Sequence, residues 1–555
     1  MTYLLVFFTS LITTIILTPF FIDFLKKTKI VDIPGGRKIH TEVIPRMGGL
    51  IIFLMVLVML NAFIDDFESI KLILFSATLL VFSGIVDDVM GLENFIKFII
   101  QNISGVILIF YLENHYTQVT LFGIIIPHPF EYLVLLVFII GVVNSINFLD
   151  GLDGLASGFS LLIFTVLLIL AIRKEDVLLM LILVSLIGST LGFLRFNAFP
   201  ASIFLGDTGS LILGFFLILL ASLTSINYHD GVLDLTYVLI LLAVPLIDTV
   251  KVFLIRIKRR RDPFSGDTNH QHHIIKSTIV SHEATVFLIE IFSLVFILIS
   301  LLYLKDYRLE ATVIFFIAGI GLIFFPTILR KLDIAERINV FLINAHDLPI
   351  KNLMKVIKVL LLLSGILMIL ISLFSFSVKT TLTQQELIFL LIMTIILLFI
   401  AIFQSKKVSS IGEINVFLNF SIFFIISKLS LPLVFSNKVT TQIIYSIVNI
   451  AFYVLTALLA LIILFRWKAL MTRKLFFTGI DLTMIVFMLL TFLVNNILKF
   501  DLNYFLSISL LQSFVFYIWY KLVIDINKKY ILNLTLISFL LPIGFLLTLL
   551  VNSFK

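Results

Sequence analysis

Acidic side chains in this sequence are concentrated where apolar stretches end, and their types suit phosphate chemistry. They form an adjacent pair at Asp87 and Asp88, a group at Asn147, Asp150 and Asp153, and a single aspartate, Asp207, in the segment FLGDTGS. Carboxylate and amide oxygens are the hard ligands that Mg²⁺ prefers, and Mg²⁺ commonly keeps water and phosphate oxygens as further ligands. Two neighbouring carboxylates can also divide the work, one as a metal ligand and one as a base.

Each of these aspartates also has a purely structural interpretation. Asp87 and Asp88 could be solvated charges at a helix end, although acids at a helix C-terminus oppose the helix dipole. Asp150 and Asp153 are each followed by glycine, and Asp-Gly pairs are frequent turn formers. Thr208 or Ser210 could cap a helix that begins near Asp207. This interpretation weakens when the clusters are taken together, because we expect all of them on one side of a membrane.

Three histidines, His270, His272 and His273, lie in a segment rich in arginine and lysine. Histidines can bind zinc, which requires a tetrahedral ligand set. With acidic segments elsewhere in the chain and cations close by, the binding of a phosphate or diphosphate fits this composition better. A solvated basic loop, or a contact with lipid headgroups, is the alternative.

Composition decides the class of protein that must position these groups. The chain has 555 residues, of which 61% are hydrophobic and 13% are charged. Soluble domains are about 45–50% apolar and about 25% charged, so this excess cannot be buried in a water-soluble core. It predicts an all-α polytopic membrane protein and argues against a secreted enzyme, a cytosolic enzyme and a nucleic-acid-binding protein. Cysteine is absent, which excludes disulfides, thiolate catalysis and cysteine-bound metals.

About eleven apolar runs of spanning length precede residue 332. They cover roughly 2–25, 47–64, 70–86, 95–112, 131–148, 156–172, 177–194, 208–225, 236–256, 284–304 and 311–329. Basic residues mark the cytoplasmic side, and 21 of the 26 lysines and arginines in residues 1–360 fall on the side of the segment that follows the first run. This bias places the N-terminus outside and all the polar clusters on the cytoplasmic face.

Residues 351–555 differ from the first 350. About seven further spans are predicted, at roughly 356–377, 387–404, 414–435, 441–465, 476–498, 503–521 and 530–551. This part has no histidine and only five acidic residues, so we do not expect catalysis there. We predict two domains: residues 1–350 carry the chemistry, and residues 351–555 form a membrane module. The module either binds a partner, helps to handle a lipid product, or is a structural extension.

Five segments together resemble the polyprenyl-phosphate N-acetylhexosamine-1-phosphate transferases. They are RKIHTEVIPRMGG, DDVMGL, NFLDGLDGLASG, FLGDTGS and HQHH, and they occur in the order typical of that family. The resemblance covers residues 1–350 and implies about eleven helices around a cytoplasm-facing cleft in the bacterial cytoplasmic membrane. It implies Mg²⁺-dependent (or Mn²⁺-dependent) transfer of a sugar 1-phosphate from a UDP-N-acetylhexosamine to polyprenyl phosphate, with release of UMP. This would be the first membrane step of cell-envelope polysaccharide synthesis.

The resemblance also implies a role for each matching residue. Asp207 would be the principal Mg²⁺ ligand, joined by Asn147 and Asp87, and one of the pair Asp87 and Asp88 would deprotonate or orient the lipid phosphate. Asn147, Asp150 and Asp153 would line the nucleotide and metal side. The uracil pocket would be formed by Asn197 and by Phe204 as a stacking platform. The sugar or phosphate contacts would come from His40, His270, His272 and His273.

Several alternatives stay open at this point. The spacing DTNHQHHI resembles the N-acetylglucosamine branch, so UDP-GlcNAc is the expected donor. Gln271 stands where that branch usually has an apolar residue, and this departure leaves another UDP-N-acetylhexosamine as the alternative. The related MurNAc-pentapeptide phosphotransferases usually have three consecutive histidines here. The mechanism is either direct attack by the lipid phosphate or a covalent phospho-aspartate route. A transporter of lipid-linked sugars is the competing class, but it would place ionisable residues inside the spans. Family members also form homodimers, and this sequence does not show an interface.

Overall fold

The computed structural model describes residues 2–33, 43–64, 66–226, 230–260, 270–278, 282–305 and 307–331. The predicted module at 351–555 and its seven spans lie outside the described residues and stay predictions. Within these ranges, nine helices are long and apolar enough to cross a membrane. The prediction of a polytopic helical membrane protein is therefore confirmed for this part of the chain.

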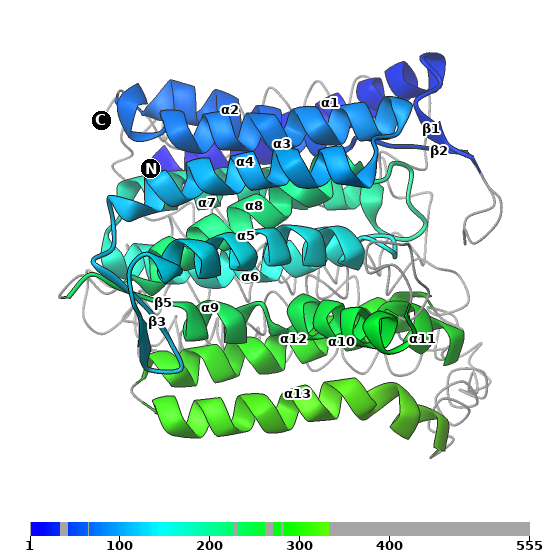
Figure 1. Ribbon diagram of the computed structural model, residues 1–555. Helices are drawn as coiled ribbons and strands as arrows, with labels where there is room; N and C mark the ends of the chain where they lie inside the picture. Colours follow the sequence, from blue (N-terminus) through cyan, green and yellow to red (C-terminus); the bar gives the residue numbers. More distant parts are fainter. Residues whose placement is uncertain are drawn as a thin grey trace, which may run out of the picture. The chain divides into compact units, whose positions relative to one another are not determined.

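Thirteen α-helices make up most of the described structure. They are α1 (Thr2–Lys27), α2 (Gly49–Phe63), α3 (Lys71–Met90), α4 (Asn94–Glu113), α5 (Phe130–Leu149), α6 (Leu155–Lys174), α7 (Val177–Asn197), α8 (Gly206–Ser225), α9 (Leu235–Leu241), α10 (Ala243–Lys258), α11 (Gln271–Thr278), α12 (His282–Leu304) and α13 (Arg308–Lys331). The long helices lie side by side, so that their ends gather in two groups (Figure 1). Each predicted apolar run lies on one of these helices, or on a pair of them.

Two of the predicted spans differ from straight crossings. The helix α2 has only 15 residues, fewer than a full crossing needs. The run at 236–256 is divided into α9 and α10, which are bent by 87° at Leu242. Pro245 lies in the first turn of α10. Proline is tolerated there, but in a continuous helix it would clash with the preceding turn and remove a hydrogen bond, which explains why the helix breaks just before it.

Short strands, which an all-α prediction did not foresee, connect some of the helices. The strands β1 (Val31–Asp32) and β2 (Ile44–Pro45) pair antiparallel after α1. The strands β3 (Gln118–Leu121), β4 (Ile124–Ile126) and β5 (Val232–Asp234) form a sheet at the opposite ends of the helices (Figure 1). Their order in this sheet is β4-β3-β5. Backbone groups outside the helices find partners in this way.

The helix α8 is the centre of the described bundle. All of its residues from Thr208 to Ser225 are buried, and it packs against α2, α3, α5 and α6. Three glycines allow this close packing: a Cβ at Gly49 would overlap the backbone of Gly209, and a Cβ at Gly84 would overlap the backbone of Thr208. The N-terminus of α8, which carries Asp207, is therefore held tightly between α2 and α3.

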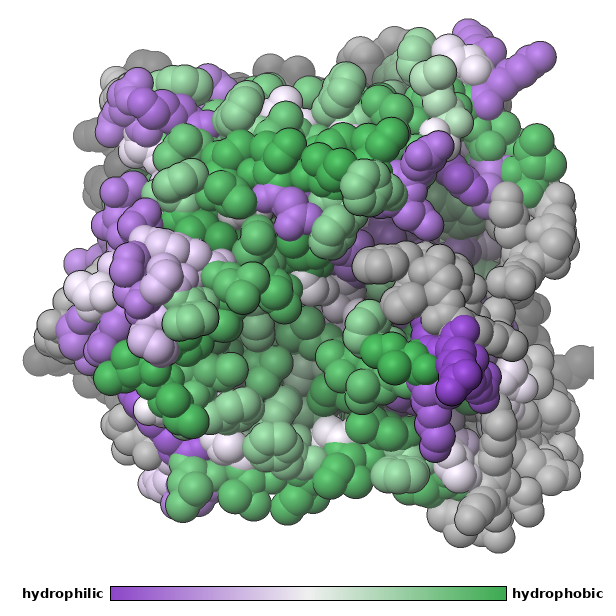
Figure 2. All heavy atoms as spheres, viewed as in Figure 1, coloured by the Kyte–Doolittle hydropathy of each residue, from purple (hydrophilic) through white to green (hydrophobic). Residues whose placement is uncertain are grey.

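The surface of the bundle separates apolar from polar side chains. Figure 2 shows apolar side chains over the middle of one face and polar side chains gathered at the two ends of the helices. Large apolar residues such as Phe82 and Ile317 are more than half exposed near the middle of α3 and α13. Such a band is expected of helices whose outer faces contact lipid, and it identifies an integral membrane protein.

Candidate functional site

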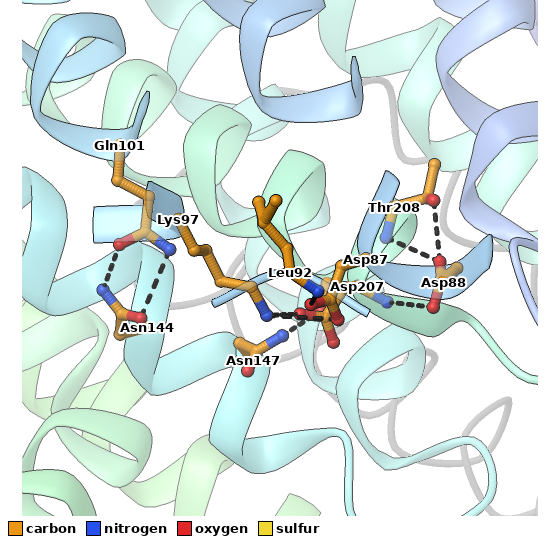
Figure 3. A network of polar contacts seen from close by, with 10 residues as sticks. Asp87, Asp88, Leu92, Lys97, Gln101, Asn144, Asn147, Asp207 and Thr208 are labelled. Carbon is orange, nitrogen blue, oxygen red and sulfur yellow. Dashed lines mark hydrogen bonds and ion pairs between the residues drawn. The ribbon is translucent and has the colours of Figure 1, made fainter. Parts of the chain in front are cut away.

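The predicted acidic residues meet at one end of the bundle. Asp87 and Asp88 lie in the last turn of α3, Asn147 lies in the last turn of α5, and Asp207 lies in the first turn of α8 (Figure 3). These helices alternate in direction, so a C-terminus, a C-terminus and an N-terminus fall at the same end. Four residues from three segments that are far apart in the sequence thus lie together at one end of the bundle.

A lysine that the sequence analysis did not single out lies at the centre of this cluster. Lys97, in the first turn of α4, forms an ion pair with Asp207 and a second one with Asp87, whose Oδ2 is 3.2 Å from the lysine Nζ (Figure 3). The ammonium group neutralises two carboxylates that would otherwise repel each other. The sequence could have indicated this lysine, because Lys97 follows Asp87 and Asp88 across a short turn, at the start of the next apolar run.

The two adjacent aspartates have different surroundings. Asp88 accepts three hydrogen bonds from the start of α8: from the Asp207 N–H at 3.2 Å, the Thr208 N–H at 3.1 Å and the Thr208 hydroxyl at 2.7 Å. Two of these donors are backbone N–H groups that a helix leaves without a helical partner, so Asp88 caps α8 from another helix. Asp87 instead accepts from the Leu92 N–H at 2.9 Å and faces Lys97.

The amide residues of α4 and α5 support the same cluster. Asn147 donates to the Ser210 hydroxyl on α8 at 2.8 Å. One turn further from the end, Gln101 and Asn144 exchange hydrogen bonds of 3.4 and 2.7 Å and join α4 to α5 (Figure 3). This pair connects the helices that carry Lys97 and Asn147.

The oxygens of this cluster suit a divalent cation of the Mg²⁺ type. Asp87 and Asp207 both reach one cationic group, the ammonium of Lys97, so both can face a common charge. Within the described residues, no group of three or more histidine or acidic side chains is arranged to hold a metal. Two carboxylates and the amide oxygen of Asn147 would leave positions for water and phosphate oxygens, which is how Mg²⁺ is usually bound.

Asp150 and Asp153 lie in the turn between α5 and α6. Burial raises the pKa of the Asp150 carboxyl well above its usual range, and the charges of Asp207, Asp88 and Asp153 raise it further. Asp150 therefore belongs to the same acidic cluster. Asp153 accepts a hydrogen bond from the Ala201 N–H at 3.0 Å and so connects this turn to the segment before α8.

The two residues predicted to bind uracil have structural partners in the described chain. Asn197 is buried; its amide oxygen accepts from the Ser157 hydroxyl at 2.7 Å and its amide nitrogen donates to the Ile203 carbonyl at 3.1 Å. The backbone of Phe204 pairs with Pro45 and Gly48 around the start of α2. Their contact with a base stays a prediction.

The histidine segment packs on the acidic turn. His270 contacts the buried carboxylate of Asp248 on α10, with 2.9 Å between Nδ1 and Oδ2. Burial lowers the pKa of His272 well below its usual range, and His273 and His270 lower it further. A Cβ at Gly151 would overlap the His272 ring, so the histidines reach the turn that carries Asp150. His40 lies outside the described residues.

Comparisons with known proteins show the family of this chain. The family described as "Glycosyl transferase family 4" matches residues 70–225, which include the whole cluster around Lys97. A probable undecaprenyl-phosphate N-acetylglucosaminyl 1-phosphate transferase of Bacillus subtilis is 33% identical over 307 residues, which are 54% of this chain and 84% of the relative. The chain belongs to glycosyl transferase family 4.

Two other relatives match stretches of similar length. The undecaprenyl-phosphate alpha-N-acetylglucosaminyl 1-phosphate transferase of Thermotoga maritima is 33% identical over 279 residues, 50% of this chain and 83% of the relative. The protein of that name from Escherichia coli K12 is 26% identical over 290 residues, 50% of this chain and 79% of the relative. These relatives each match about half of this chain. The predicted domain bounds, 1–350 and 351–555, stay predictions.

Proposed function

We propose that the chain transfers N-acetylhexosamine 1-phosphate from a UDP-sugar to polyprenyl phosphate and releases UMP. The observation that carries this proposal is the ion-paired cluster of Asp87, Lys97 and Asp207 at one end of a membrane-spanning bundle. The reaction joins two anions, so its main requirement is neutralisation of charge. The acceptor has a polar head and an apolar tail, so a site at the end of membrane helices suits it.

A Mg²⁺ ion, with Mn²⁺ as the alternative, would be held by Asp207, Asp87 and the amide oxygen of Asn147. When bound, such an ion neutralises charge on the diphosphate of the donor. Lys97 would then exchange its carboxylate partners for phosphate oxygens, since its ammonium group is a mobile point charge on a flexible stem. Asp207 is positioned for its role by the cap that Asp88 places on α8.

We propose a direct transfer. An oxygen of the lipid phosphate attacks the phosphorus that carries the sugar, the bond from that phosphorus to the bridging oxygen breaks, and UMP leaves with the bridging oxygen. A covalent route through Asp88 would sacrifice the cap of α8, since both of its oxygens accept hydrogen bonds there. Asp87, which faces Lys97, would receive or orient the proton of the lipid phosphate.

The proposal also names the sugar donor and the membrane face on which the site lies. UDP-GlcNAc is the preferred donor because the relatives in these comparisons are named for N-acetylglucosamine. The excess of basic residues on the side of the site supports our proposal that it faces the cytoplasm, at the bacterial cytoplasmic membrane. Transfer of the first sugar to the lipid would begin the synthesis of an envelope polysaccharide.

A transferase assay on the full chain in detergent tests the proposal. The assay combines sugar-labelled UDP-GlcNAc, undecaprenyl phosphate and Mg²⁺, with Asp207→Asn and EDTA as controls. We expect labelled lipid and UMP in equal amounts, both lost in the two controls and restored by Mg²⁺ after EDTA. Lipid product that persists with EDTA would overturn the metal assignment. Folded protein that is inactive with every UDP-N-acetylhexosamine would overturn the function and favour the transport alternative.

A further inference from the structure

Gln271 interrupts the histidine segment, and the structure gives its side chain a specific partner. The residue is buried in the first turn of α11, and its Nε2 donates a hydrogen bond of 3.0 Å to the carbonyl oxygen of Leu322 on α13. Burying an amide among helices is costly unless it makes hydrogen bonds. The question is therefore why the Leu322 carbonyl of α13 accepts this hydrogen bond.

Pro326 provides that reason. It lies inside α13, four residues after Leu322. In an α-helix the carbonyl of residue i accepts from the N–H of residue i+4, and proline has no N–H. Leu322 is buried, so its carbonyl has little access to water. The Gln271 amide supplies the donor that Pro326 removes.

A second contact holds the other side of the same turn. The backbone N–H of Gln271 donates to Oδ1 of Asp248 on α10 at 2.8 Å, and Oδ2 of that carboxylate contacts His270. The turn that carries the histidines is thus fixed to α10 through Asp248 and to α13 through Leu322. Two attachments on different helices restrict both the position and the rotation of α11.

We propose that Gln271 is a positioning residue that fixes the histidine segment on the broken turn of α13. Its side chain is committed to α13 through the bond to Leu322 and does not select the sugar. His270, His272 and His273 are held over the Asp150 turn as a result. The kinetic consequences of this inference depend on the proposed function, whereas the attachment of α11 to α13 does not.

The test compares Gln271→Met with the full wild-type chain in detergent. Methionine has nearly the shape of glutamine and lacks only the amide. We expect faster hydrogen exchange of the α11 backbone, measured by mass spectrometry on peptides that cover residues 270–278. We also expect KM for UDP-GlcNAc to rise about three- to ten-fold, as the loss of one hydrogen bond would produce, with a smaller change in kcat. Ser277→Ala, on the exposed side of the same helix, should change neither quantity.

Two further results distinguish this role from others. If Gln271 selects the sugar, Gln271→Met will change the ratio of kcat/KM between UDP-GlcNAc and its C4 epimer; we expect an unchanged ratio. In a Pro326→Ala background the helix regains a donor for the Leu322 carbonyl, so Gln271→Met should have a smaller effect on exchange there. Unchanged exchange of α11 in the single variant overturns the inference, whether or not Pro326→Ala folds. An inactive wild type with the expected exchange pattern overturns only the proposed function.

Discussion

At the scale of single residues, Lys97 determines the charge balance of the site. It is the cation between Asp87 and Asp207, which belong to two other helices. Loss of the ammonium would leave two carboxylates facing each other without a neutralising group, and would remove a donor for substrate phosphate. The same residue thus serves the free protein and, in our proposal, the reaction.

We predict that Lys97→Met lowers the rate of lipid-product formation at least about 100-fold, as is typical for the loss of a group that stabilises transition-state charge. Lys97→Arg should keep part of the activity because the charge remains. Lys71→Met is the matched control, since Lys71 pairs with Glu68 at an exposed position of α3 and should not affect the rate. Activity in Lys97→Met within a few-fold of wild type would contradict this role.

The raised pKa of Asp150 predicts how the stability of the protein depends on pH. An unfolded aspartate has a pKa of about 3.9, and burial raises the pKa of Asp150 in the folded protein. Between these two values the unfolded chain releases a proton that the folded chain keeps, so stability falls as the pH rises above about 4. We expect Asp150→Asn to raise the melting temperature without added metal, by an amount that grows as the pH rises above about 4. A pH-independent difference between the two proteins would refute the assignment.

At the scale of secondary-structure elements, α8 depends on α3 for its first turn. Asp88 caps α8 through Thr208 and the Asp207 N–H, whereas the backbone hydrogen bond of its neighbour Asp87 in the described structure comes from Leu92 and not from α8. In our proposal the adjacent pair therefore combines two roles: Asp88 is structural and Asp87 takes part in the chemistry.

The two variants Asp88→Asn and Asp87→Asn should separate these roles. Asp88→Asn should increase hydrogen exchange at residues 206–210 and lower stability by about 1 kcal/mol, the usual cost of a lost cap. Asp87→Asn should leave exchange of α8 unchanged while lowering the transferase rate. If Asp88→Asn abolishes turnover with α8 still protected, then Asp88 acts in the chemistry itself.

The crossing of α3 and α8 makes a second prediction for the elements. A Cβ at Gly84 would overlap the Cα of Thr208, so Gly84→Ala should force the helices apart and cost about 1–3 kcal/mol. Gly141 on α5 has no atom within 4 Å of an added Cβ, so Gly141→Ala should be neutral or stabilising. Thermal unfolding in detergent compares the two variants, and equal melting temperatures would contradict the close packing.

At the scale of the whole molecule, the absence of cysteine allows a direct test of orientation. The β3–β4 hairpin lies at one end of the helices, and α11 lies at the other (Figure 1). The acidic turn lies at the α11 end, because a Cβ at Gly151, beside Asp150, would overlap the His272 ring. Ile124 in the hairpin is 71% exposed, and Ser277 on α11 is exposed. Single cysteines at these two positions would be the only thiols in the chain.

We predict that Ile124→Cys reacts with a membrane-impermeant maleimide in intact cells, and that Ser277→Cys reacts only after the cells are permeabilised. The reason is the excess of lysine and arginine on the side that carries α11. The unmodified chain, which has no thiol, measures background labelling. Labelling of Ser277→Cys in intact cells would place the site on the outer face and overturn the cytoplasmic assignment.

The sequence alone determined the class of protein and the chemical types in the site. Apolar runs of about 20 residues require a membrane, and their order places the ends of α3, α5 and α8 together, which brought Asp87, Asn147 and Asp207 into one prediction. These inferences depend on the lengths of the apolar runs and on the alternating direction of successive spans, and both can be read from the sequence. The length and bend of the segment around Leu242 could have been inferred in part from Pro245.

Only the tertiary structure decided how these groups divide their roles. Lys97 contacts an aspartate 110 positions away, Asp88 contacts a threonine 120 positions away, and Gln271 contacts a carbonyl 51 positions away. Each contact depends on which faces of two helices meet, and the composition of either helix alone does not specify this. The roles of Asp88 as a cap, Lys97 as a counter-ion and Gln271 as a donor to the Pro326 turn therefore required the packed bundle.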